Sequence, residues 1–129
     1  MNRKYLEDIL PKEEIFGYHD VSDKRHKRWC EQEEKYGFCD IETWDLDAAF
    51  AQLIYERLMM FKEIGGKVVD LTFNKHNYLG EEKTEEELID IMIEKCKEAM
   101  LEMNHNTDHV EIMDEVYEIL KICHKGLWW

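Results

Sequence analysis

The segment LDAAFAQLIYERLMMF, residues 46–61, decides the fold class of this chain. Its apolar residues recur at steps of three and four, the spacing that predicts an amphipathic α-helix. They are Leu46, Phe50, Leu53, Ile54, Leu58 and Phe61, and Ala49, Tyr55, Met59 and Met60 widen the apolar arc. We therefore expect a helix of roughly five turns at the centre of the fold or in a self-association surface. Gly65 and Gly66 follow, where a left-handed residue often ends a helix.

Two more long helices are predicted towards the C-terminus. Thr84 and Glu87 form a capping box, in which each side chain satisfies a free backbone amide. The helix that follows is predicted to bury Leu88, Ile91, Met92, Cys96, Ala99, Met100 and Met103. After a turn at residues 104–107, a helix from near Asp108 is predicted to end at Gly126. Its buried face would hold Ile112, Met113, Val116, Ile119, Leu120 and Cys123.

The N-terminal third gives weaker patterns. Ser22 is suited to cap a helix to about Lys35 that stops at Gly37, and Pro11 would end a short helix over residues 5–10. Residues 68–73, VVDLTF, have β-propensity but no partner strand, so residues 65–83 are predicted as a long loop. The chain is thus expected to be all-α, a single domain over residues 1–129 with residues 1–21 as an N-terminal arm. We expect a small bundle of three long helices plus one or two N-terminal helices.

The charge of the chain limits the kinds of partner that it is expected to bind. Its formal net charge is −13, which argues against direct nucleic-acid binding because phosphate neutralisation needs a basic surface. Residues 81–120 carry fourteen acids against three lysines, whereas residues 24–28, KRHKR, form a basic patch. The acids fit the solvated faces of two helices, or an acidic surface that imitates nucleic acid towards a basic partner.

Several classes of protein are disfavoured. No apolar run has the length of a membrane span and the N-terminus lacks a secretory signal pattern, so we expect a cytoplasmic protein, in whatever cell makes it. The four cysteines show no zinc-site spacing. Asp45 and Asp47 with a histidine are the nearest approach to a metal site, but two residues two positions apart on a helix point roughly 200° from each other. No phosphate loop or activated nucleophile is present, so we predict no enzyme, no metal and no cofactor.

The stretch YGFCDIETWDLD, residues 36–47, joins two predicted helices. Gly37 would end the first helix, and Thr43 or Asp45 would start the second. Asp45 and Asp47 would then face the positive end of the helix dipole. Trp44 would pack back on the helix and fix the angle at which the chain enters it.

This stretch also carries a resemblance. Together with Leu58, Phe61, Leu71, Thr72 and the segment TEEELIDIMIEKCKEAM at residues 84–100, it resembles a family of small proteins encoded by tailed bacteriophages. In that family a basic segment precedes a YGFSD-x-x-x-W-x-LD motif, and a helix with arginines follows. Here the helix has Arg57 alone, the connector is longer, and Leu88 stands where the family has tryptophan. The resemblance implies a phage origin and carries no activity with it.

The sequence leaves binding as the expected activity. A ligand pocket would use Arg57 with Lys24, Arg25 and Arg28 as phosphate partners, Trp44, Tyr36 or Trp29 as stacking surfaces, and Asp45 and Asp47 nearby. A protein partner would instead meet the acidic helices and the terminal Trp128 and Trp129. We expect a homo-oligomeric phage accessory protein that binds and inhibits a host component, as an anti-defence protein. The alternatives are an oligomeric sponge for a nucleotide immune signal, and a structural or regulatory phage protein with no defence role.

Overall fold

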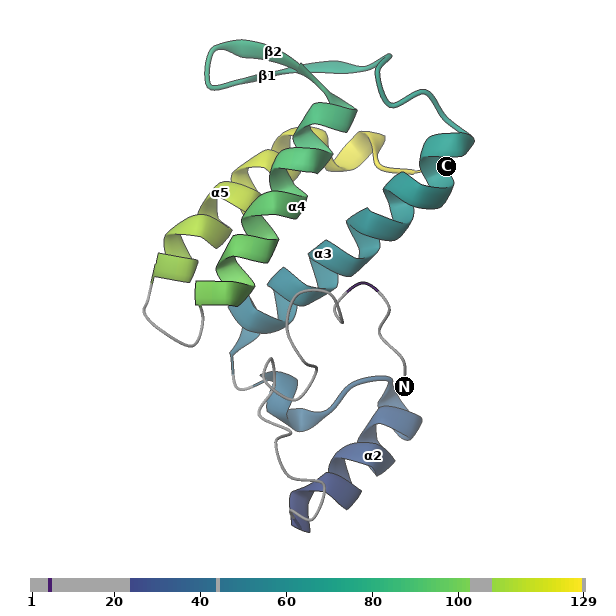
Figure 1. Ribbon diagram of the computed structural model, residues 1–129, viewed down its shortest axis with the longest axis vertical. Coiled ribbons are helices and arrows are strands. Elements are labelled where there is room, and N and C mark those ends of the chain that lie inside the picture. The colour runs from purple at the N-terminus through teal and green to yellow at the C-terminus, as the bar shows by residue number, and fades with distance from the viewer. Residues whose placement is uncertain (1–4, 6–23, 44, 103–107, 129) are drawn as a thin grey trace.

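The computed structural model describes Tyr5 and residues 24–43, 45–102 and 108–128, and this part of the chain is mainly helical (Figure 1). The helices are α2 (Lys24–Tyr36), α3 (Leu46–Ile64), α4 (Glu85–Glu102) and α5 (Asp108–Cys123). Short 3-10 turns are η1 (Asp40–Thr43), η2 (Gly65–Lys67) and η3 (His124–Gly126), and a hairpin is formed by β1 (Lys75–Tyr78) and β2 (Glu81–Thr84). No helix among these residues is long and apolar enough to cross a membrane.

The core lies among α3, α4 and α5, with α4 packed along both of the others. The predicted helices α4 and α5 and most of their buried faces are confirmed. The predicted residues that are 1% exposed or less are Leu88, Met92, Cys96, Ala99, Met100, Met113, Val116, Ile119 and Cys123; Ile89, which was not predicted, is also fully buried. Complete burial of such side chains is worth about 1.5–3 kcal/mol each, so this layer supplies most of the stability of the fold.

Helix α3 forms as predicted, but it turns a different face to the core. Its buried residues are Ala48, Ala51, Gln52, Tyr55 and Leu58. Leu46, Phe50 and Leu53, which the spacing placed in the core, are 54%, 42% and 41% exposed. The small alanines allow α4 to approach closely on the inward side. The prediction chose the larger apolar residues. Leu58 is buried and Ile54 and Phe61 pack against the core as expected, whereas Leu46, Phe50 and Leu53 lie on the outward side of the helix.

The end of α3 also differs from the expectation. Gly65 keeps right-handed helical angles (φ −64°, ψ −35°), and its N–H donates to the carbonyl of Phe61. The turn continues as η2, where the N–H groups of Val68 and Val69 both donate to the carbonyl of Gly65. Residues 68–73 then form the predicted connector, anchored by the buried side chain of Leu71.

The hairpin corrects the prediction of a purely helical chain. Antiparallel β1 and β2 pair Lys75 with Thr84 and Tyr78 with Glu81 inside the segment predicted as a loop. Leu79 and Gly80 join them with positive φ angles of 52° and 81°, as in the two-residue turns that fit twisted strands. The strands are mainly polar, with half of their residues exposed and none fully buried, so no apolar alternation marks them in the sequence.

The hairpin leads directly into α4, at the opposite end of the helical layer from α2 (Figure 1). The predicted capping box is confirmed. Thr84 Oγ1 accepts from the N–H of Glu87, and Glu87 Oε1 accepts from the N–H of Thr84, both at 3.2 Å. The carboxylate of Glu85 is buried 3.4 Å from His76 Nε2, and a side chain at Gly126 would collide with it. A glycine at this position therefore lets η3 close over the start of α4.

Candidate binding surfaces

The segment after α2 folds into a corner centred on Asp40. Its Oδ1 accepts from the indole N–H of buried Trp29 at 3.1 Å, and its Oδ2 accepts from Gln32 at 3.4 Å. Arg28 forms an ion pair with the same carboxylate, and the N–H of Asp40 donates to Gln32 Oε1 at 2.9 Å. Gly37 ends α2 at φ 83°, as predicted, and its N–H donates to the carbonyl of Glu33. Asp40 thus ties η1 to one side of α2.

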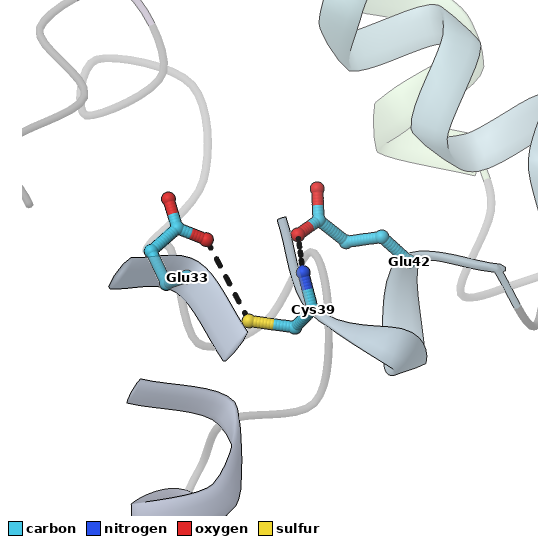
Figure 2. A group of neighbouring side chains, drawn as sticks. All are labelled: Glu33, Cys39 and Glu42. Carbon is cyan, nitrogen blue, oxygen red and sulfur yellow. Dashed lines mark hydrogen bonds between the residues drawn. The ribbon is translucent and has the colours of Figure 1, made fainter. Parts of the chain in front are cut away.

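Figure 2 shows the other contacts of this corner, around Cys39. The single S–H of the buried thiol has two acceptors in reach, the carbonyl of Trp29 at 3.1 Å and the carboxylate of Glu33 at 3.6 Å. The N–H of Cys39 donates to Glu42 at 2.7 Å. Ligand atoms of Glu33, Cys39 and Glu42 lie within 4.8 Å of one another, a donor set suited to zinc. The contact of Glu42 resembles a capping box at the start of η1, so the cluster is explained as the closure of the corner.

A second group of acids lies where α3 meets α5. Asp45 is the N-cap of α3 and accepts from the N–H of Ala48, while Asp47 accepts from the hydroxyl of Tyr117 at 2.8 Å. His109 Nε2 lies 3.8 Å from Asp45, and ligand atoms of these two aspartates and His109 fall within 4.8 Å of one another. The prediction that the aspartates point apart is wrong, because Asp45 lies outside the helix with extended angles (φ −141°, ψ 101°).

These contacts explain the cluster as a set of side-chain interactions that join the start of α3 to α5. Burial, together with the bond to Asp47, raises the pKa of the Tyr117 hydroxyl above its ordinary value of 10.0, so the hydroxyl remains a hydrogen-bond donor further into the alkaline range. Asp45 stabilises the positive end of α3, as the sequence predicts. Neither aspartate lines the groove described next, so they lie apart from the other candidate ligand residues.

A groove of about 450 Å³ separates the end of α2 from the outward side of α3. Two predicted ligand residues, Tyr36 and Arg57, line it together. Phe38, Leu46, Phe50 and Leu53 make the remaining wall largely apolar. Gln52 also lines it and is 2% exposed. Its Nε2 donates to Glu56, while its Oε1 has no hydrogen-bond partner among the residues that the structure describes. Such a groove suits an apolar group more than a phosphate, because Arg57 is the one cation on its described wall.

None of the remaining candidate residues whose side chains are described lines this groove. Arg28 pairs with Asp40 and is absent from its lining. Lys24 and Arg25 lie in the first turn of α2, and their side chains are outside the described part of the structure. Trp44 and Trp129 are outside it as well. Trp128 is 73% exposed, beyond the end of α5. Of the basic and aromatic side chains predicted to form a nucleotide pocket, Tyr36 and Arg57 are therefore the two described ones that line the groove.

The acidic helices expose part of the predicted acidic surface. On α5, Glu111, Asp114 and Glu118 are exposed, while Met113, Val116 and Ile119 enter the core. On α4, Glu94 and Glu98 are exposed, but Glu85 is buried and Asp90 pairs with Lys62 of α3 at 2.5 Å. Lys95 of α4 and Glu115 of α5 form an ion pair between the two helices. The acids of α5 named here are therefore exposed on its outward side, whereas those of α4 include exposed, buried and ion-paired residues.

No protein-family model, curated protein or solved structure matches this chain. Its function must therefore be argued from the surfaces described above. The sequence prediction missed Phe38, Phe50 and Gln52 as groove residues. The available signal was the width of the apolar arc of α3, which exceeds what one buried face requires.

Proposed function

We propose that this protein is a non-enzymatic binding protein that covers a basic surface of a protein partner with the outward faces of α4 and α5. The observation that carries the proposal is the division of α5 into a buried apolar face and an outward face with Glu111, Asp114 and Glu118. These acids fall within about two helical turns, so their fields add over one patch. Such a patch attracts a basic surface and repels nucleic acid.

The exposed indole of Trp128 supplies an apolar contact beyond the same helix. Tryptophan is enriched at binding hot spots because it buries a large rigid area and can also donate a hydrogen bond. Charge complementarity would speed association, while Trp128 would slow dissociation. If the chain is of phage origin, as the resemblance implies, then by analogy with other small phage proteins we expect the partner to be a host component that binding inhibits, for example in antiviral defence.

A second candidate function is a pocket for a nucleotide signal. It is favoured by the position of Tyr36 and Arg57 in one groove, where a base would stack on the tyrosine and a phosphate would meet the guanidinium. It is weaker because Arg28 is already paired with Asp40 and the protein carries a net charge of −13. A structural or regulatory phage protein with no defence role would use the same surfaces on a phage partner.

The test compares two triple variants that change the charge equally. The first is Glu111→Lys, Asp114→Lys and Glu118→Lys on α5, and the control is Glu31→Lys, Glu34→Lys and Glu82→Lys on other exposed positions. Each is used for affinity capture from bacterial lysate at low and high salt. We expect a partner that wild type and control retain, that the α5 variant loses, and that high salt releases.

Two results would contradict the proposal. Equal capture by both triple variants would show that the α5 patch is not the contact surface. A small-molecule adduct in native mass spectrometry that Arg57→Ala removes, without a protein partner, would favour the nucleotide pocket instead.

A further inference from the structure

The outward face of α3 is apolar where a helix at the edge of a fold usually carries charge. Leu46, Phe50, Leu53, Met60 and Ile64 are 54%, 42%, 41%, 50% and 42% exposed. With 100° per residue, this row points roughly 170° away from the buried row of the same helix. Exposed apolar surface of this extent marks an interaction site in soluble domains.

The spacing of the row is that of a helix-pairing seam. Leu46, Phe50, Leu53, Arg57, Met60 and Ile64 follow one another at steps of four, three, four, three and four. Alternate steps of three and four are the a and d positions of a coiled coil, which meet a second helix by knobs-into-holes packing. Within the described chain, α4 packs on the other side of α3, and the end of α2 borders the seam only across the groove, so no described helix packs along the seam.

The seam is also symmetric about Tyr55. If a second α3 packs antiparallel with that residue at the centre, Leu46 lies opposite Ile64 of the second copy, and Phe50 lies opposite its Met60. Leu53 lies opposite Arg57, whose aliphatic stem packs on apolar neighbours while its guanidinium reaches the rim. A two-fold interface needs a surface that complements itself. In this register each seam residue lies opposite another seam residue of the second copy, so the row can pair with itself.

Charge selects a second copy as the occupant. Two chains of net charge −13 repel each other unless they meet over a face that lacks acids. The six seam positions hold no acid and one cation, Arg57, whereas the outward face of α5 exposes Glu111, Asp114 and Glu118. From these observations we propose that the protein forms a symmetric, antiparallel dimer through the outward face of α3.

The size of the seam sets the expected affinity. Eighteen steps of about 1.5 Å give a contact roughly 27 Å long. Exposed Tyr36 and Phe38 of the corner widen it beside Phe50. This is at the lower end of specific interfaces, so we expect dissociation on the order of micromolar. The dimer leaves the acidic face of α5 free on both copies, because that face lies on a different helix.

The first test is sedimentation equilibrium of the full chain from sub-micromolar to sub-millimolar concentration. We expect a monomer–dimer equilibrium that Phe50→Glu shifts to monomer by at least tenfold in Kd, with unchanged circular dichroism. The matched control is Phe73→Glu, which places the same charge on a residue that is 80% exposed outside the seam, and it should dimerise as wild type does. A wild type that stays monomeric throughout, or an equal effect of the two variants, would overturn the proposal.

The second test reads the register in a Cys30→Ser background. Phe50→Cys and Met60→Cys chains are oxidised separately and as a mixture. We expect a disulfide-linked dimer in the mixture alone, because position 50 faces position 60 in the antiparallel register. Crosslinking of each variant with itself would indicate a parallel pair and overturn the symmetry argument. Charge reversal on α5 should leave both results unchanged, which separates this proposal from the proposed function.

Discussion

The two halves of the molecule are held together by different kinds of contact. Helices α3, α4 and α5 share a core of fully buried apolar side chains. The corner of α2 and η1 buries Trp29 and Cys39, but hydrogen bonds to Asp40 and Glu42 set its geometry. Figure 1 shows α2 set apart from the three-helix layer. We infer that the layer carries the global stability, while the corner can open locally.

This difference predicts how substitutions act. Burial is cooperative, because a cavity in a packed core affects every neighbour. Hydrogen bonds in a partly exposed corner compete with water, so each contributes about 0.5–1.5 kcal/mol and its loss stays local. The four predictions below test that contrast, from the largest expected effect to the smallest.

Ile119→Ala should have the largest effect. Ile119 is 0% exposed in the core between α4 and α5, and removing its methyl groups should cost about 2–5 kcal/mol of unfolding free energy. Urea denaturation followed by circular dichroism would measure it. Ile122→Ala on the same helix, where the side chain is 37% exposed, is the matched control and should cost much less. Equal costs would mean that this layer is not the stabilising core.

High pH should weaken the layer through Cys96. Burial raises the pKa of its thiol from 9.0 to about 12. The unfolded thiol ionises first, so this contribution to stability is complete below pH 9 and is lost as the pH rises towards 12. Between pH 9 and 10.5 we expect a loss of about 2 kcal/mol, measured by urea denaturation at each pH.

Two cysteine variants isolate that effect. Cys96→Ala should show a flatter decline of stability with pH, whereas Cys30→Ala, at an exposed thiol, should decline as wild type does. Burial also raises the pKa of Cys123, to about 11, so part of the decline should persist in Cys96→Ala. Identical slopes for wild type and Cys96→Ala would assign the alkaline response to other groups.

Asp40→Ala should open the corner and spare the layer. It removes the acceptor of the Trp29 indole and the ion pair of Arg28, at an expected local cost of about 1–2 kcal/mol. Hydrogen exchange should show faster exchange of the amides of α2, with those of α4 and α5 unchanged. Glu31→Ala, at an exposed position of α2, is the control. Loss of protection throughout the chain would show that the corner and the layer unfold together.

The same contrast explains which features the sequence predicted. The faces of α4 and α5 were predicted because apolar residues at helical spacing there have acids on the opposite side. The capping box of Thr84 and Glu87 was predicted because it is local in sequence. For α3 the periodicity identified the helix but only part of its inward side, since both sides are apolar and the small residues Ala48 and Ala51, which face the core, were not chosen.

The candidate site depended on contacts that spacing cannot reveal. Asp40 and Cys39 act through partners on α2 that are six to twelve residues away, and His109 approaches Asp45 from another helix. The assumption that Asp45 belongs to the helix separated it from Asp47, whereas its extended backbone brings the two carboxylates together. The hairpin was missed because its strands are polar and Leu79 stands where a turn usually has asparagine or aspartate.

Thr84→Ala tests a single polar contact within the layer and should have the smallest effect. The substitution removes the oxygen that accepts from the N–H of Glu87, and the loss of such a cap costs about 1 kcal/mol. Hydrogen bonds from Thr84 also lower the pKa of Glu87. The contribution of that carboxylate is therefore present above its ordinary pKa and is lost as the pH falls through the lowered value.

Urea denaturation at neutral and acidic pH would measure both effects of Thr84→Ala. Thr72→Ala, which removes an exposed hydroxyl from the connector, is the control and should change stability by no more than about 0.5 kcal/mol. If Thr84→Ala lowered the free energy of unfolding as much as Ile119→Ala does, the cap at the start of α4 would contribute as much to stability as the packing of the core. The contrast between a layer held by burial and a corner held by hydrogen bonds would then fail.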